Sequence, residues 1–344
     1  MHLKKTTAKA PVKGSLRRRR VNWSALAEQV LAGHRLTARE ALAVLTSADE
    51  DLLDVLAAAY RVRRHWFGDR VSLNFLLNAK SGLCGEDCAY CAQSRISRAK
   101  IARYPLVDAA TVWQAAEAAA AHHARTFCWA VSGRVPSDME LDALATLVPE
   151  IKARFGFRVC FSVGLLSLEQ ARRLKACGVD RINHNLNTSR RFYPKICTTH
   201  TYQQRLNTLR NVRRAGLEIC SGGIVGMGET PADVVALALE LSRLEVEALP
   251  VNFLLPLAGT PLAGFQVLTP RYCLKVLAMF RLTNPKTELR IAAGREVHLG
   301  PLQPLGLFAA NSMFVGGYLT AKGRPAEEDY QMLEALGFSR DVDW

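Results

Sequence analysis

From residue 71 onward, short β-rich hydrophobic runs alternate with longer stretches in which apolar residues recur every three or four positions. The short runs are typical of buried strands and the longer stretches of amphipathic helices. Such an alternation indicates parallel strands joined by crossover helices. The pattern predicts eight strands, at 71–79, 126–133, 157–164, 181–187, 218–226, 248–256, 289–296 and 312–319. It predicts helices between them at 109–123, 141–155, 167–178, 202–216 and 232–244.

Eight strand–helix units over about 250 residues predict an α/β fold of the (β/α)8 TIM-type barrel class, with its active site at the C-terminal ends of the strands. A doubly wound open sheet is the alternative, but no G-x-G-x-x-G follows the first strand. Upstream, residues 23–67 have helical spacing, with Thr37 and Ser47 placed as N-caps. We therefore expect a disordered basic tail at 1–22, N-terminal helices at 23–70, a barrel at 71–322 and a C-terminal segment at 323–344.

The composition, 49% hydrophobic and 22% charged over 344 residues, is that of a globular protein with a large core, in one large or two medium domains. No apolar run approaches the roughly 18 residues of a membrane span, and no secretory signal follows the N-terminus. We expect a cytoplasmic protein with no membrane partner.

The net charge of +14 is concentrated at one end of the chain, because residues 1–20 hold eight cations and no acid. This tail is typical of a solvated arm; weak contact with RNA or membranes and an organelle transit peptide are alternatives. The remaining chain gives no reason to expect a nucleic-acid partner.

Nine cysteines without a secretion signal indicate reduced thiols and metal ligands rather than disulfides. Three of them, Cys84, Cys88 and Cys91, follow the first predicted strand with the spacing C-x3-C-x2-C. Three thiolates in a tight loop can hold three irons of a cubane cluster and leave the fourth iron open. Zinc is the alternative, although a structural zinc site is normally closed by a fourth ligand.

Cys128, Cys160 and Cys220 each fall in the middle of a predicted strand, and Arg290 has a similar position. Because strand side chains alternate between faces, these four could converge inside the barrel on a second metal centre. The alternative is that each thiol packs as a small hydrophobic group. The remaining cysteines are expected to pack in that way: Cys177, Cys197 and Cys273.

Polar residues also occupy strand positions. Asn183, Asn185 and Asn187 alternate along one predicted strand, and Asn252 lies in another, so they predict a ligand-binding set, with a satisfied core network as the alternative. His184, between the asparagines, is expected to face the helix layer. The segment 222–229 reads G-x-I-x-G-x-x-E, whose glycines would allow a planar ring to approach the backbone.

The C-x3-C-x2-C loop, with Tyr90 before its last cysteine, and the G-x-I-x-G-x-x-E segment resemble radical S-adenosylmethionine (SAM) enzymes. Among these, the chain resembles the biotin synthase family over about residues 24–338. The resemblance rests on NAKSGLCGEDCAYCAQS, RINHNLNTS, TTHTYQQRLNTL, CSGGIVGMGE, PVNFL, GTPL, RIAAGRE and QPLGLFAANSMFVGGYLT. The chain differs from many relatives in lacking proline after the first and third loop cysteines.

The resemblance implies a 4Fe-4S cluster on the catalytic cysteines 84, 88 and 91, with SAM bound to the open iron, and a sacrificial 2Fe-2S cluster on Cys128, Cys160, Cys220 and Arg290. It also implies a set of SAM contacts, in which Asn187 replaces the aspartate of some relatives, and two contacts to the substrate dethiobiotin. The SAM contacts are Tyr90, Asn183, Asn185, Asn187, Arg205, Gly226 and Glu229, and the substrate contacts are Asn185 and Asn252.

The implied activity is that of a sulfurtransferase, which converts dethiobiotin to biotin by radical sulfur insertion, as a homodimer with an electron donor such as flavodoxin or ferredoxin. Two alternatives stay open. Another radical SAM enzyme, of mutase or hydrogenase-maturation type, would not need three strand cysteines and Arg290. A zinc-stabilised nucleic-acid-binding protein would contain zinc and bind RNA in a salt-sensitive way.

Overall fold

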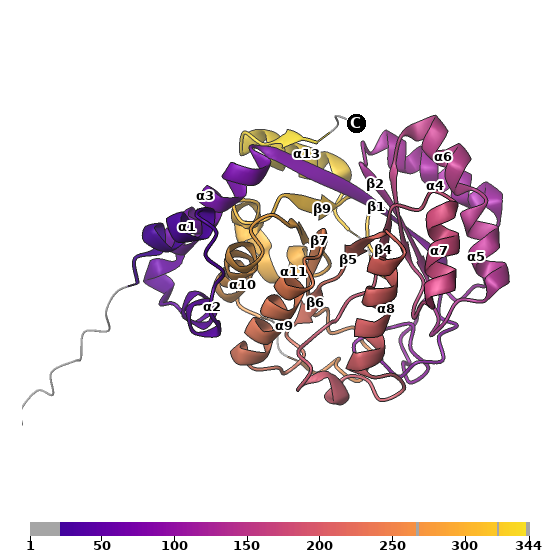
Figure 1. Ribbon diagram of the computed structural model, residues 1–344, viewed down its shortest axis with the longest axis horizontal. Helices are drawn as coiled ribbons and strands as arrows, with labels where there is room; N and C mark the ends of the chain where they lie inside the picture. Colours follow the sequence, from indigo (N-terminus) through magenta and orange to yellow (C-terminus); the bar gives the residue numbers. More distant parts are fainter. Residues whose placement is uncertain (1–20, 266–267, 322, 342–344) are drawn as a thin grey trace, which may run out of the picture.

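The computed structural model describes residues 21–265, 268–321 and 323–341. Its parallel strands form a closed ring, because β1 (Arg70–Lys80) pairs with both β2 and β9. The expected (β/α)8 barrel is therefore confirmed (Figure 1). The other ring strands are β2 (Thr126–Val131), β3 (Arg158–Ser162), β4 (Arg181–Asn183), β5 (Glu218–Cys220), β6 (Gly223–Val225), β7 (Ala248–Phe253), β8 (Glu288–Ile291) and β9 (Ser312–Phe314).

The predicted strand 218–226 is broken into β5 and β6, which together occupy one position of the ring. Glycines allow a close approach at the break. A Cβ on Gly222 would lie 1.9 Å from the carbonyl oxygen of Pro250, and one on Gly223 would lie 2.8 Å from that of Asn187. These glycines are therefore required by the packing of the protein on itself, a reason that the sequence pattern alone does not reveal.

Seven helices cover the outside of the ring (Figure 1). The predicted helix 141–155 is two helices, because Pro149, which lacks an N–H, lies in the first turn of the second, which begins at Val148. The helix at 270–283 was not predicted from the sequence. All of its residues from Cys273 to Thr283 are buried, so it has no polar stripe. The seven are α4 (Ala109–Ala121), α5 (Asp138–Ala145), α6 (Val148–Phe155), α7 (Leu168–Ala176), α8 (Tyr202–Arg214), α9 (Pro231–Arg243) and α10 (Pro270–Thr283).

Helices α1 (Trp23–Leu31), α2 (Ala38–Leu45) and α3 (Leu52–Phe67) form a group beside α10, which lies between them and the barrel (Figure 1). Thr37 is the N-cap of α2, as predicted, and forms a capping box with Glu40. The prediction for Ser47 is wrong: its hydroxyl donates to the carbonyl of Val44, and the 3-10 turn Asp49–Asp51 precedes α3.

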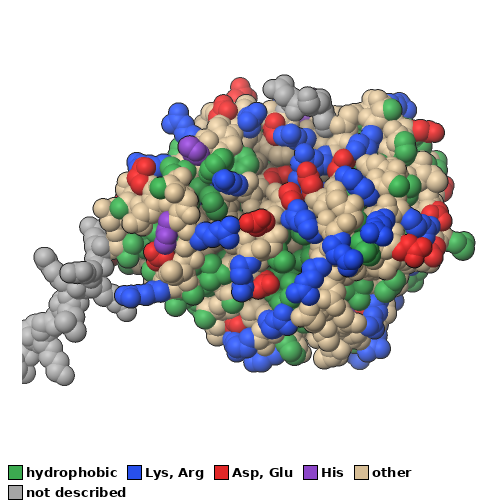
Figure 2. Space-filling model, in the orientation of Figure 1, with side chains coloured by type: hydrophobic (Ala, Val, Ile, Leu, Met, Phe, Trp, Pro, Cys, Tyr) green, Lys and Arg blue, Asp and Glu red, His purple; other side chains and the backbone are tan. Residues whose placement is uncertain are grey.

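The chain ends with α11 (Arg295–Leu299), α12 (Gln303–Gly306), α13 (Ala326–Ala335) and the short β10 (Ser339–Arg340), which pairs with the start of β1. The four predicted segments stay a prediction, and residues 1–20 of the basic tail lie outside the described residues. Across the described part of the chain, each helix is too short or too polar to cross a membrane. Basic and acidic side chains are mixed over the face shown in Figure 2.

Candidate active site

A cavity of about 390 Å³ opens at the C-terminal ends of the barrel strands. Its volume falls in the range of small-molecule sites. Twelve of the fifteen predicted site residues line it, and the other three, Cys220, Gly226 and Glu229, do not. The twelve are Cys84, Cys88, Tyr90, Cys91, Cys128, Cys160, Asn183, Asn185, Asn187, Arg205, Asn252 and Arg290.

The outer cysteine loop, residues 81–108, connects β1 to α4. Turns around Cys88 and Cys91 fold it: the amide of Cys91 donates to the carbonyl of Cys88 and the amide of Ser94 to that of Cys91. Burial raises the pKa of Cys84, and raises that of Cys91 to about 11. Without a metal these thiols are therefore protonated at neutral pH, so a bound metal must displace their protons.

Arg205, which lines the cavity from α8, is fixed by the protein. Its Nη1 donates to the backbone carbonyl of Asn185 at 2.8 Å, and its Nε donates to the hydroxyl of Tyr193. Burial opposes the charge, but Tyr90 and Tyr193 raise the pKa of the guanidinium above its ordinary value. Arg205 is thus a positioned cation, suited to bind a carboxylate.

The three alternating asparagines all line the cavity, although β4 ends at Asn183 and only that residue is in the strand. Asn183 donates to the sulfur of Cys220 at 3.1 Å, and the side-chain oxygen of Asn185 accepts from the amide of Gly222 at 2.9 Å. The amide of Asn187, a residue with φ of 67°, donates to the hydroxyl of Tyr90 at 2.6 Å. The set is therefore partly satisfied by the protein itself.

Asn252 lies on β7 and faces the same cavity. Its Nδ2 donates to the carbonyl of Gly223 at 3.1 Å, and its Oδ1 accepts from the amide of Ala293 at 3.2 Å. These bonds use one donor and one acceptor of the amide and leave the second N–H and a lone pair. His184 was expected to face the helix layer, but the structure places it among the residues that line the cavity.

The strand cysteines meet inside the barrel. Cys128 and Cys160 are register partners on β2 and β3, and both pack against Cys220. Together with Ala248 they form a buried cluster separate from the main core. The contact with Cys160, and then the cations Arg290 and Arg181, lower the pKa of Cys220 to about 6. The same contacts raise the pKa of Cys160, so Cys220 is the thiol poised to carry negative charge, as metal-binding thiolates do.

A buried ionic network lies beside these thiols. Arg290 donates from Nη2 to Glu288 at 2.6 Å and from Nε to Ser312 at 3.2 Å, and Arg181 joins Glu288 at 2.8 Å and Glu218 at 2.9 Å. Burial alone would raise the pKa of Glu288, but the two arginines hold it below its usual range. Arg290 is therefore a charged guanidinium with no lone pair in that state.

Sequence reasoning missed the other members of this network. A signal was available, since Arg181, Glu218 and Glu288 each stand two positions before a predicted site residue and so share its strand face. Charged residues at such positions indicate a buried polar centre.

Gly226 and Glu229, which the resemblance implies as SAM contacts, are not among the residues that line the cavity. The carboxylate of Glu229 accepts from the backbone amides of Gly226 and Met227, at 2.6 and 2.7 Å. It therefore stabilises its own loop. The role of Gly226 and Glu229 in binding a cofactor stays a prediction.

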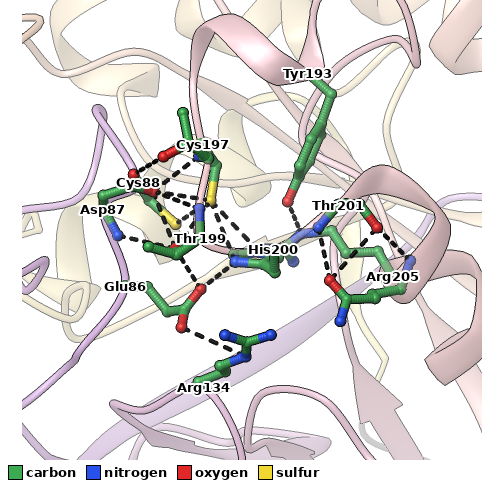
Figure 3. Close-up of polar contacts among 12 residues, drawn as sticks. Glu86, Asp87, Cys88, Arg134, Tyr193, Cys197, Thr199, His200, Thr201 and Arg205 are labelled. Atoms are coloured by element: carbon green, nitrogen blue, oxygen red, sulfur yellow. Dashed lines mark hydrogen bonds and ion pairs between the residues drawn. The ribbon is translucent and has the colours of Figure 1, made fainter.

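Cys197 does not lie in an ordinary apolar environment. Its sulfur lies 3.8 Å from that of Cys88, in the outer cysteine loop, and 3.2 Å from Nδ1 of His200 (Figure 3). Cys197 and Cys88 are 109 positions apart, so no local pattern signalled this contact. Cys177 is half-buried at the end of α7 and Cys273 is buried in α10.

Comparisons with known proteins agree with this geometry. Residues 80–241 match the Radical SAM superfamily, and residues 250–339 match the Biotin and Thiamin Synthesis associated domain. The biotin synthase of Geobacillus kaustophilus is 55% identical over 317 residues, which cover 92% of this chain and 95% of that protein. The chain belongs to the biotin synthase family.

Two further biotin synthases support the assignment. That of Rhodopirellula baltica is 52% identical, over 92% of this chain and 88% of its own, and that of Bacillus subtilis is 50% identical, over 92% and 94%. Membership in the radical SAM superfamily implies a 4Fe-4S cluster and SAM for this member of the biotin synthase family.

Solved structures show the same fold at low identity. Methylornithine synthase superposes with a TM-score of 0.77 at 21% identity, over 92% of this chain and 97% of that one. The FeFe-hydrogenase maturase HydG from Carboxydothermus hydrogenoformans superposes with a TM-score of 0.78 at 18% identity, over 94% and 80%. These likenesses agree with the barrel fold of this member of the biotin synthase family.

Proposed function

We propose that this protein is a biotin synthase, a sulfurtransferase that converts dethiobiotin to biotin by radical insertion of sulfur. The observation that carries the proposal is that one cavity brings together two separate cysteine sets. The loop set, Cys84, Cys88 and Cys91, lines this cavity. Cys128 and Cys160 line it too, and they pack in one buried cluster with Cys220.

The loop cysteines fit a 4Fe-4S cluster by number and by spread. Three thiolates leave one iron of a cubane open, which is where SAM would bind. Among the described residues, the three sulfurs are not as compact as a single-ion site requires, because only Cys88, Cys197 and His200 place three ligand atoms within 4.8 Å of one another. A wider set suits a cluster of several irons.

The interior cysteines fit a 2Fe-2S cluster by their chemistry. The contacts among the three thiols lower the pKa values of Cys128 and Cys220 and raise that of Cys160. Arg290 would complete the set as a weak ligand, since its Nε and Nη2 are engaged by Ser312 and Glu288 and a guanidinium has no free lone pair while charged. A weak fourth ligand is consistent with a cluster that is consumed.

When bound, SAM on the 4Fe-4S cluster supplies a 5′-deoxyadenosyl radical and the 2Fe-2S cluster supplies sulfur, the chemistry needed to replace two unactivated C–H bonds by C–S bonds. The protein's part is to position the reactants and exclude water. Arg205, fixed by Asn185 and Tyr193, would bind the SAM carboxylate, and the Asn187–Tyr90 pair would position its adenosine part.

Asn252 would bind the ureido ring of dethiobiotin. Its remaining N–H and lone pair match the acceptor and donor that a urea presents side by side. Asn185, whose side-chain oxygen accepts from Gly222, next to the residue that Asn252 contacts, would contribute a second polar contact. The electron donor, such as flavodoxin or ferredoxin, and the homodimer are part of the same proposal.

The test is anaerobic reconstitution with iron and sulfide, followed by turnover with dethiobiotin, SAM and a reductant. We expect iron–sulfur absorbance, 5′-deoxyadenosine and biotin, with loss of sulfide from the protein during one turnover. A reconstituted protein that holds zinc instead of iron would contradict the proposal. So would a reaction with dethiobiotin in which SAM is cleaved but no biotin forms.

A further inference from the structure

A second set of metal-binding side chains lies next to the outer cysteine loop. One ligand atom each of Cys88, Cys197 and His200 lie within 4.8 Å of one another, and no other three such residues do so in the described part of the chain. All three are buried, and Figure 3 shows them close together. Cys88 comes from the loop after β1, and the other two from the segment that precedes α8.

The distances are those of a tetrahedral site for one ion. With zinc–sulfur bonds of about 2.3 Å, two thiolates on the same zinc lie about 3.8 Å apart. The sulfurs of Cys88 and Cys197 are 3.8 Å apart. A thiolate and an imidazole nitrogen on one zinc would lie about 3.6 Å apart. The sulfur of Cys197 is 3.2 Å from Nδ1 and 3.9 Å from Nε2 of His200, on either side of that value.

A carboxylate orients the histidine. Glu86 contacts Nδ1 of His200, and Glu86 is itself held by the hydroxyl of Thr199 at 2.6 Å and by Arg134 at 3.8 Å (Figure 3). A carboxylate on one ring nitrogen fixes the tautomer that presents the other nitrogen to a metal. Here Nε2 is the nitrogen left for the ion.

Asp87 joins the two segments that supply the ligands. Its carboxylate accepts from the backbone amides of Thr198 and Thr199, at 2.9 and 3.2 Å, and its own amide donates to the hydroxyl of Thr199 at 3.2 Å. The ligand positions are therefore held before any ion binds, which lowers the cost of binding. Cys88 and His200 line the cavity, so an ion can enter from it.

We propose that Cys88, Cys197 and His200 bind a single zinc-class divalent cation in the cluster-free chain, with the fourth position open to the cavity. Binding releases the thiol protons to solvent. The ion competes with assembly of the 4Fe-4S cluster, because Cys88 belongs to both ligand sets. Only this competition rests on the proposed function; the ion site itself depends on the three side chains alone.

Titration of the full-length, reduced, cluster-free protein with Co²⁺ and with Zn²⁺ tests the site. We expect one ion per chain, with the visible spectrum of tetrahedral cobalt bound to thiolates. Cys197→Ser should lower the Zn²⁺ affinity at least about 10-fold, and His200→Gln should do the same. Cys84→Ser and Cys177→Ser, which leave the three ligands intact, should keep the wild-type affinity and spectrum.

Reconstitution with iron and sulfide should affect the variants in the opposite way from zinc binding. This difference separates the ion site from the proposed function. Cys84→Ser should lose the 4Fe-4S absorbance, whereas Cys197→Ser should keep it, and Zn²⁺ added first should slow reconstitution of the wild type but not of Cys197→Ser. If Cys84→Ser lost cobalt binding and Cys197→Ser kept it, the proposed ion site would be overturned. Failure of cluster assembly in the wild type would overturn only the proposed function. Unfolding curves of each variant identify any that fails to fold. If one of Cys197→Ser and His200→Gln does not fold, the other one tests the site.

Discussion

Cys128 and Cys160 are direct register partners on the neighbouring parallel strands β2 and β3. Partners in a parallel pair project to the same face of the sheet, so both thiols point into the barrel. Their separation is therefore set by the barrel itself, whereas the outer cysteines belong to a loop. This difference lets the two sets be tested separately.

Replacement of an interior cysteine should separate SAM cleavage from biotin formation. We expect Cys220→Ala to release 5′-deoxyadenosine and to form no biotin, because the outer cysteines remain but the sulfur source does not. Mass spectrometry of both products from one anaerobic reaction checks this. Cys177→Ala, half-buried at the end of α7, is the matched control and should still form biotin. Biotin formation by Cys220→Ala at the control rate would rule out the assignment.

Replacement of an outer cysteine should abolish both reactions. Cys84→Ala removes one of three thiolates that hold the cluster, and we expect no reconstituted 4Fe-4S absorbance and no 5′-deoxyadenosine. Cys84 is a better choice than Cys88, because it is outside the set formed by Cys88, Cys197 and His200. Retained SAM cleavage in Cys84→Ala would mean that the cluster has other ligands.

Arg290 should matter to stability more than to ligation. In Arg290→Met, the buried Glu288 loses one of its two arginines and keeps Arg181, so we expect the free energy of unfolding to fall by about 2 kcal/mol, less than for a completely unpaired charge. Some biotin formation should remain, because a poor donor contributes little to holding the cluster. Urea unfolding of the cluster-free protein measures the change.

The double variant Arg290→Met/Glu288→Gln completes a cycle. We expect a coupling energy of at least about 1 kcal/mol, since the two side chains are in direct contact. Additive effects would show that the ion pair does not stabilise the fold.

His184 should make the protein less stable in mild acid. Burial, and then Arg205 and His200, hold its pKa well below the ordinary value of 6.5, and its Nε2 has no hydrogen-bond partner among the described residues. Below about pH 6.5 the unfolded chain binds a proton here and the folded chain does not, so stability falls by about 1.4 kcal/mol per pH unit.

Unfolding by urea between pH 7.5 and pH 5, in roughly half-unit steps, measures this slope. Carboxyl groups titrate below this window, at about pH 4. His184→Gln should remove most of the slope whatever its effect at neutral pH, and an unchanged slope would assign the loss to another group.

The C-terminal helix should depend on one buried ion pair. Asp329, a completely buried residue of α13, binds Arg295 on α11 with both carboxylate oxygens, at 3.0 and 2.7 Å. Asp329→Ala leaves a buried arginine without its main partner and should cost about 3 kcal/mol in the free energy of unfolding. Glu328→Ala, which removes the more exposed pair with Arg324, is the control and should cost at most about 0.5 kcal/mol. Equal effects of the two variants would contradict this account.

Hydrophobic periodicity was enough to predict the barrel, because each strand and most helices bury a face that recurs along the local sequence. Hydrophobic periodicity gave wrong or missing elements where no such recurring buried face marks the element. Helix α10 is buried on all sides and shows no stripe, and Pro149 divides a stretch whose apolar spacing is continuous. Ser47 has the residue type of an N-cap, but its hydroxyl bonds backwards to the end of α2.

The same division holds for the site. Close spacing within one loop was enough to single out Cys84, Cys88 and Cys91, and strand position was enough for Cys128, Cys160 and Cys220. The chain by itself therefore determined the barrel and the two cysteine sets. The partners Glu288 for Arg290, and Cys197 and His200 for Cys88, were decided only by the tertiary structure. Contacts between segments far apart in the chain depend on how the strands close and where the loops end, and no short-range pattern records that.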